Sequence, residues 1–268
     1  MIAGTQSHAH WRIRAQAHMT SEAYVWIAAG LGLILASFIG LVSLRWPQDR
    51  PIALSRSTCA GCGRQLGVLD LVPILSFLAL RGRCRACAAP IPRRYLALEL
   101  ACPALAFWAG SVREGPEILF GAGLAWALLL LAILDFEHFW LPDEVTLPLA
   151  GAGLFAAWYI PHAPSLLEAM IGCAIGFGFF WGLAFAYRRL RGREGLGGGD
   201  ARLLAAAGAW VGWIGLPSVL LWASLSGLSL VCARLLMGRT IRAEDRIPFG
   251  IFLALGLWLT WAYGPLGL

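Results

Sequence analysis

The sequence predicts an all-α polytopic membrane protein with about eight transmembrane helices and one long polar loop. Of the 268 residues, 59% are hydrophobic and only 13% are charged, whereas soluble domains average roughly 25% charged residues. The mean hydropathy of +0.70 is correspondingly high. So much apolar surface requires the lipid bilayer as a partner, and the thirteen Trp suit a protein that is anchored at two membrane interfaces.

The chain divides by composition into four parts. Residues 1–22 form a polar N-terminal tail, and residues 23–45 form the first transmembrane helix. That apolar run is long enough to span a bilayer, so we expect no cleavable signal peptide. Residues 46–94 are the long polar loop, and residues 95–268 form a transmembrane core. The apolar runs of the core lie at about 95–112, 117–135, 145–160, 165–187, 201–215, 217–236 and 248–265.

The region 201–236 decides the helix count. Gly215-Leu216-Pro217 predicts a short turn that divides this region into a helical hairpin. With that turn the chain has eight transmembrane helices, and without it seven.

The positive charge is distributed in the pattern of a membrane protein. All 21 basic residues are Arg, and they cluster in the loops 46–94, 188–200 and 237–247. By the positive-inside rule these loops are cytoplasmic, which makes the chain a multi-pass membrane protein with its basic loops inside. Because the Arg residues lie beside apolar runs and form no continuous basic surface, we expect no nucleic-acid partner.

Four cysteines in the polar loop form two CxxC pairs, Cys59 with Cys62 and Cys84 with Cys87. Two such pairs, 21 residues apart, have the spacing at which four thiolates surround one tetrahedral Zn²⁺. A redox pair and a metal-free loop are the alternatives, although a reducing cytoplasm disfavours disulfides. We therefore predict a structural zinc ion that folds a loop with few apolar residues of its own.

Two acids stand at the ends of apolar runs. Asp135 ends one run, and Asp200 follows a glycine-rich segment, 194–199, directly before another. Acids at membrane depth are costly and usually functional. Brought together, two such carboxyl groups can share a proton and serve as general base and general acid in proteolysis. In the alternative interpretation, Asp200 caps its helix and Asp135 pairs with an Arg of a loop.

Two further acids have structural interpretations. Asp143 follows Pro142 and is expected to be the N-cap of the next helix. Glu99 lies inside an apolar run, where a buried carboxylate needs a partner, and an Arg of the cysteine loop is the obvious candidate.

Together these motifs resemble the type IV prepilin peptidases, bacterial inner-membrane aspartic proteases with a GxGD motif. The resemblance covers nearly the whole chain from about residue 35. It is carried by Ser37-Phe38-Ile39, the two CxxC pairs, Arg94-Tyr95 through Glu99-Leu100, Leu134-Asp135 with Leu141-Pro142-Asp143, Glu194 through Asp200, and Ile247-Pro248-Phe249-Gly250.

The resemblance implies a function. Such enzymes remove the basic leader from type IV prepilins or type II secretion pseudopilins at the cytoplasmic membrane face, and the catalytic acids would be Asp135 and Asp200. Many also methylate the new N-terminal residue with S-adenosylmethionine, for which Glu99, Asp70 and the zinc loop are candidates. The chain departs from the family at Gly40, Leu71 and Arg202, where relatives often have Asn, Asn and Lys.

Two other functions remain open. The chain could be a peptidase without methyltransferase activity, since Gly40 and Leu71 lie in the region associated with methyl transfer. It could also be a non-catalytic membrane protein, either a pilus-assembly factor or a transporter. A transporter would be expected to carry its acids near the bilayer midplane.

Overall fold

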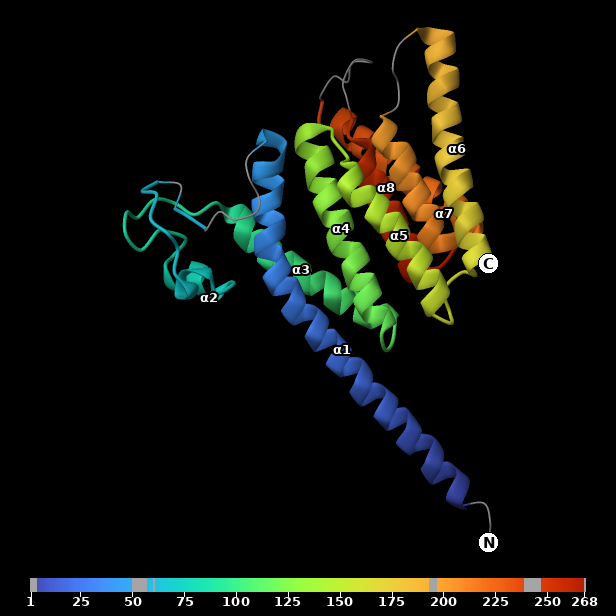
Figure 1. The fold of residues 1–268 in the computed structure, drawn as a ribbon, viewed down its shortest axis with the longest axis horizontal. Coiled ribbons are helices and arrows are strands. Elements are labelled where there is room, and N and C mark those ends of the chain that lie inside the picture. The colour runs from blue at the N-terminus through green and yellow to red at the C-terminus, as the bar shows by residue number, and fades with distance from the viewer. Residues whose placement is uncertain (1–3, 50–56, 60, 193–196, 239–246, 268) are drawn as a thin grey trace. The chain divides into compact units, whose positions relative to one another are not determined.

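The computed structural model describes residues 4–49, 57–59, 61–192, 197–238 and 247–267. These residues form helices and no β-strand, with only two isolated β-bridges, which confirms the predicted all-α fold (Figure 1). The α-helices in chain order are α1 (Gly4–Arg45), α2 (Leu75–Ala79), α3 (Arg93–Val112), α4 (Glu117–His138), α5 (Asp143–Tyr159), α6 (Leu166–Arg191), α7 (Gly198–Leu236) and α8 (Phe249–Tyr263).

Five helical stretches within the described residues are long and apolar enough to cross a membrane. They are Ser21–Gln48, Arg93–Val112, Glu117–His138, Leu166–Leu190 and Gly198–Leu236. The first comprises most of α1, which begins inside the polar tail at Gly4 and ends at Arg45, and the short 3₁₀ turn Trp46–Gln48 that follows it. With 17 and 15 residues, α5 and α8 are shorter than the roughly 20 residues of a typical span. The polytopic membrane fold is thus confirmed, whereas the count of eight crossings stays a prediction.

The chain forms two compact units, residues 1–126 and 127–268, which are described separately. In the first unit, α1 and α3 pack as an antiparallel pair. A methyl group at Gly110 would lie 2.3 Å from Val25 Cγ2, and one at Gly32 would lie 3.1 Å from the backbone of Cys102. Trp126 Nε1 donates to the carbonyl of Cys102 at 2.9 Å and attaches α4 to the pair. Small residues therefore set the helix separation in this unit.

The cysteine loop consists of two turns with the same hydrogen-bond pattern. In the first turn, the Cys59 N–H donates to the Arg64 carbonyl, and the Gly63 N–H donates to the Cys59 carbonyl, both at 2.9 Å. The second turn repeats the pattern around Cys84. The turns need left-handed backbone at equivalent positions, with φ of 69° at Gly63 and 57° at Ala88. This backbone points both cysteine pairs toward one centre.

In the second unit, α7 packs against α5, α6 and α8. Its contact with α6 is unusually close, because a methyl group at Gly208 would lie 2.1 Å from the Gly172 carbonyl oxygen, and one at Gly176 would lie 2.4 Å from that of Leu204. Its contact with α5 includes a buried hydrogen bond from Trp210 Nε1 to the Leu149 carbonyl at 2.9 Å. These contacts fix where α7 begins relative to α5 and α6.

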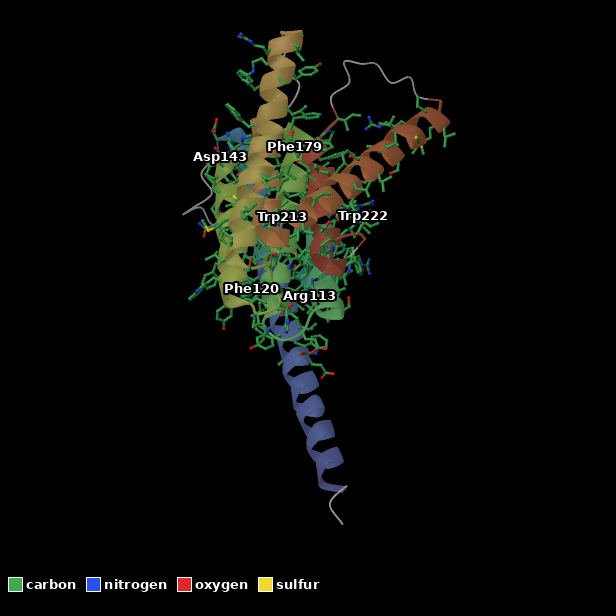
Figure 2. The ribbon with its side chains drawn as sticks, turned by 90° about the vertical axis from the view of Figure 1, so that its right-hand side faces the viewer. Arg113, Phe120, Asp143, Phe179, Trp213 and Trp222 are labelled. Carbon is green, nitrogen blue, oxygen red and sulfur yellow. The ribbon has the colours of Figure 1, made fainter. Side chains whose placement is uncertain are left out.

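The 39 residues of α7 would measure about 58 Å as one straight helix, roughly twice the apolar thickness of a bilayer. The backbone leaves the helical region at Gly212, where φ is 69° and ψ is 175°. Beyond this point Gly215 contacts Thr260 and Gly256 contacts Val219, so the second half of α7 runs antiparallel to α8. Figure 2 shows this half, which carries Trp222, pointing away from the first.

The two ends of α7 confirm that the chain reverses. Leu141 lies against both Gly199, at the start of α7, and Gly250, at the start of α8, so both helices begin at the same end of the unit. The first half of α7 leaves that end and the second half returns toward it. The predicted hairpin therefore exists, but its predicted position at Gly215-Leu216-Pro217 is wrong. Pro217 lies inside the second half and removes one backbone hydrogen bond without ending the helix.

Gly212 occupies a backbone region that is essentially reserved for glycine. We expect Gly212→Ala to destabilise the protein by about 1–3 kcal/mol, because the added Cβ strains the turn. The measurement is the unfolding temperature of the purified protein in detergent. Gly178→Ala is the matched control, because Gly178 lies in α6 with open space around it. Equal unfolding temperatures for the two variants would contradict the assigned turn.

Candidate active site

Asp135 lies in the last turn of α4 and is only 5% exposed. The backbone N–H of Ile251, in the first turn of α8, donates to Asp135 Oδ2 at 3.1 Å. A methyl group at Gly250 would lie 2.9 Å from the same oxygen, so glycine is what permits this approach. Because an unpaired buried carboxylate is costly, the hydrogen bond anchors the start of α8 to Asp135.

Asp200 is the third residue of α7 and is half-buried. Residues 193–196, which include the first part of the glycine-rich motif, lie outside the described residues. The next part of the motif packs tightly, since a methyl group at Gly199 would lie 2.7 Å from Leu141 Cβ. Leu141 Cδ1 also contacts the Gly250 position at 2.9 Å. A single side chain therefore separates the two helix starts that flank the acids.

The structure brings the two predicted acids into one site. Asp135 and Asp200 lie where α4 ends and α5, α7 and α8 begin, and Leu141 contacts the starts of both α7 and α8. Both acids belong to the unit 127–268, so the site lies within one compact body. Their catalytic role stays a prediction.

The expected cap role of Asp143 is wrong. Pro142 is the N-cap of α5, and Asp143 is the first helical residue, with no capping hydrogen bond from a side chain. Asp143 Oδ1 instead accepts a hydrogen bond from Arg202 Nη1 in an ion pair. Asp143 is labelled in Figure 2. No local sequence pattern connects the two residues, because 59 positions separate them.

The four loop cysteines form a cluster of metal-ligating geometry. The Sγ atoms of Cys59, Cys62, Cys84 and Cys87 all lie within 4.8 Å of one another. Cys59 Sγ and Cys87 Sγ are 3.7 Å apart. A tetrahedral zinc ion with Zn–S bonds of about 2.3 Å requires sulfur separations of about 3.8 Å. The donor set and its spacing therefore fit zinc.

The electrostatics of the cluster favour a bound cation. Backbone N–H groups of Cys62 and Gly61 lower the pKa of the Cys59 thiol to about 6, which favours the thiolate. At Cys87 the N–H of Ala89 acts in the same direction, but the neighbouring cysteines and burial outweigh it and raise the pKa to about 11. Each thiolate makes the next harder to form, and a divalent cation supplies the missing charge.

A cavity of about 460 Å³ adjoins the cysteine cluster in the first unit. Asp70 and Glu99 both line it, together with Tyr95 and the cluster residues Cys59 and Cys84. Asp70, Glu99 and the cysteine loop, which the sequence analysis groups together, thus line one cavity. The role of these residues there stays a prediction.

The two cavity acids are held differently. The Asp70 side chain is 8% exposed and lies 3.6 Å from Arg64 and 3.3 Å from Arg85. Its Oδ1 atom is buried without a hydrogen-bond partner among the described residues. Glu99 Oε2 accepts the backbone N–H of Ile74 at 2.7 Å. That amide, which the sequence did not suggest, is the partner that the structure assigns to Glu99.

An acid pair at one end of a polytopic helical bundle, with one acid buried and the other half-buried, is the arrangement expected of an intramembrane aspartic peptidase. Comparison with known proteins agrees with it. Residues 31–111 match the Bacterial Peptidase A24 N-terminal domain, and residues 122–232 match the Type IV leader peptidase family. The chain belongs to the type IV leader peptidase family.

Several relatives carry the name prepilin leader peptidase/N-methyltransferase. One from Burkholderia pseudomallei (strain K96243) is 40% identical over 262 residues, which cover 87% of this chain and 84% of the relative. One from Aeromonas hydrophila is 39% identical over 214 residues, covering 80% and 73%. One from Stutzerimonas stutzeri is 34% identical over 270 residues, covering 90% and 91%. No solved structure matches the chain significantly.

The cysteine cluster generates a test of metal binding. We expect the purified protein to contain about one zinc ion per chain, and Cys62→Ser or Cys87→Ser to lose it, because three thiolates do not complete the site. Acidification should release the ion as the thiolates are protonated. Elemental analysis measures the zinc content, and Cys232→Ser, outside the cluster, should retain the wild-type value. Full zinc content in both cluster variants would exclude the site.

Proposed function

We propose that this protein is an aspartic endopeptidase that removes the basic leader from type IV prepilins or type II secretion pseudopilins. One observation carries the proposal: Leu141 contacts both Gly199, next to Asp200, and Gly250, which lies against Asp135, so acids from two different helices share one end of the second unit. Both acids lie within residues 122–232, which match the type IV leader peptidase family. The names of the relatives indicate a prepilin substrate, and the pseudopilins are part of the proposal.

The acid pair can divide the chemistry of peptide hydrolysis. One carboxylate takes a proton from a water molecule, whose oxygen attacks the scissile carbonyl carbon, while the other carboxyl group protonates the carbonyl oxygen. The carbon–nitrogen bond then breaks, and the departing amine takes up a proton. The net reaction adds one water across the peptide bond, so it requires only these two groups and water.

The position of the acids favours a peptidase over a transporter. Asp135 lies in the last turn of α4 and Asp200 in the first turn of α7, so both are at helix ends and neither is at a midpoint. Transporters place their key acids near the bilayer midplane. A site at the membrane face is open to a leader that precedes a membrane-embedded helix.

We assign the active site to the cytoplasmic face of the bacterial inner membrane. Arg188 and Arg189 lie at the end of α6, just before the segment that leads to Asp200. Basic residues at that end favour a cytoplasmic location. By the same rule, residues 46–94 form a cytoplasmic zinc loop between the first transmembrane helix, 23–45, and the peptidase core, 95–268, with 1–22 as an N-terminal tail.

We also propose that the protein methylates the new N-terminal amine with S-adenosylmethionine. The cavity of about 460 Å³ supports this activity, since it lies within the usual range of small-molecule sites. S-adenosylmethionine supplies an activated methyl group on a cationic sulfur when it is bound. Glu99 would provide negative charge for the cofactor, and Asp70 would hold Arg64 and Arg85 in place at the cavity. The zinc site would shape one wall, because Cys59 and Cys84 line the same cavity.

The peptidase proposal is tested at the acid pair. Asp135→Asn and Asp200→Asn should each abolish prepilin cleavage, because neither amide can exchange the proton that hydrolysis requires. Membranes containing each variant are incubated with a synthetic prepilin, and the product is measured by mass spectrometry. Glu114→Gln, at an exposed acid of the first unit, should cleave at the wild-type rate. Normal cleavage by both Asp variants would exclude this site.

The methyltransferase proposal is tested at the cavity. Asp70→Asn and Glu99→Gln should reduce methylation at least about tenfold, as expected when a charged contact is lost. Both should retain cleavage, since their side chains belong to the first unit. Mass spectrometry separates the cleaved product from the same product carrying one methyl group. If both variants methylate normally, the cavity is not the site of methyl transfer.

A further inference from the structure

The segment that carries Asp200 cannot hold this residue in place by itself. Gly198 and Gly199 form the first two positions of α7, and the N-cap, Gly197, provides no side-chain hydrogen bond. Glycine is among the poorest helix formers, because it has the most conformational freedom to lose. The first turn of α7 therefore depends on contacts from elsewhere in the fold.

Two such contacts come from one short segment. Leu141 packs against Gly199, immediately before Asp200. Asp143 pairs with Arg202, two residues after Asp200. The segment that provides both Leu141 and Asp143 follows directly from the end of α4, which carries Asp135. Residues 141–143 thus contact the chain on both sides of Asp200. The same residues follow the end of α4, which carries Asp135.

The ion pair is suited to alignment more than to global stability. The side chains of Arg202 and Asp143 are 35% and 46% exposed, and pairs at such positions contribute little to the free energy of unfolding. The Arg guanidinium is planar and directional, so it restricts the geometry of its partner. Asp143 is also favourably placed in the first turn of α5, where the helix dipole attracts negative charge.

We propose that Asp143 and Arg202 are a positioning pair that aligns Asp200 with Asp135 for peptide hydrolysis. The pair fixes the first turn of α7 to the first turn of α5. Leu141 sets the distance between the start of α7 and the segment that leads into α5. Neither residue exchanges protons with the substrate. The inference rests on the proposed peptidase function and adds two residues to its machinery.

The test compares single variants, a conservative variant and a charge exchange. Asp143→Asn and Arg202→Gln should each lower kcat for prepilin cleavage by about tenfold to a hundredfold, the scale of a small misplacement of catalytic groups. KM and the unfolding temperature in detergent should change little. Arg202→Lys should retain more activity than Arg202→Gln because it keeps the charge, and the exchange of Asp143→Arg with Arg202→Asp should recover activity relative to either of its single variants.

The control is Glu144→Gln, which removes the same charge from the same turn of α5 at an exposed position. It should leave kcat unchanged. Wild-type kcat in both Asp143→Asn and Arg202→Gln would overturn the positioning pair while leaving the peptidase proposal intact. Losses that are not recovered by the exchange and that parallel lower unfolding temperatures would assign the pair a purely structural role. Absence of cleavage by the wild-type protein would overturn both proposals.

Discussion

The second unit depends on the burial of one carboxylate. Asp135 is almost fully enclosed, and the described contact that compensates its oxygen is the N–H of Ile251. An uncompensated charge at this depth would be costly, so α8 must begin where its first turn can reach Asp135. Gly250 makes that approach possible. Because Asp135 needs this hydrogen bond, the end of α4 lies against the start of α8.

The second acid is placed by helix packing. In lipid, apolar side chains gain little from leaving their surroundings, so close backbone contact and polar bonds determine how helices associate. Gly172 and Gly208 bring α6 and α7 together, and the Trp210 indole ties α7 to α5. These contacts set the position of α7 along α5 and α6, and therefore the position of Asp200 at its start. Small residues far from the site thus determine the geometry of the acid pair.

The sequence predicts those features of the fold that depend on local pattern. Apolar runs locate the membrane helices, and CxxC spacing locates the cysteine cluster. Gly215-Leu216-Pro217 predicts the turn in this region, because Gly and Pro together favour turns. The structure places it at Gly212, where the backbone adopts a conformation that only glycine tolerates. Which glycine provides the turn depends on its packing against Pro164 and Glu168, which no local pattern records.

The candidate site divides in the same way. Asp135 and Asp200 could be found because an acid at the end of an apolar run is unusual in itself. The sequence does not indicate the roles of Arg202, Leu141 and Ile251, since each contacts a residue more than fifty positions away. Asp143 shows the same limit, because its local context fits a cap, whereas its partner comes from α7. Chemistry can therefore be inferred from the residues that perform it, while the alignment of those residues requires the folded chain.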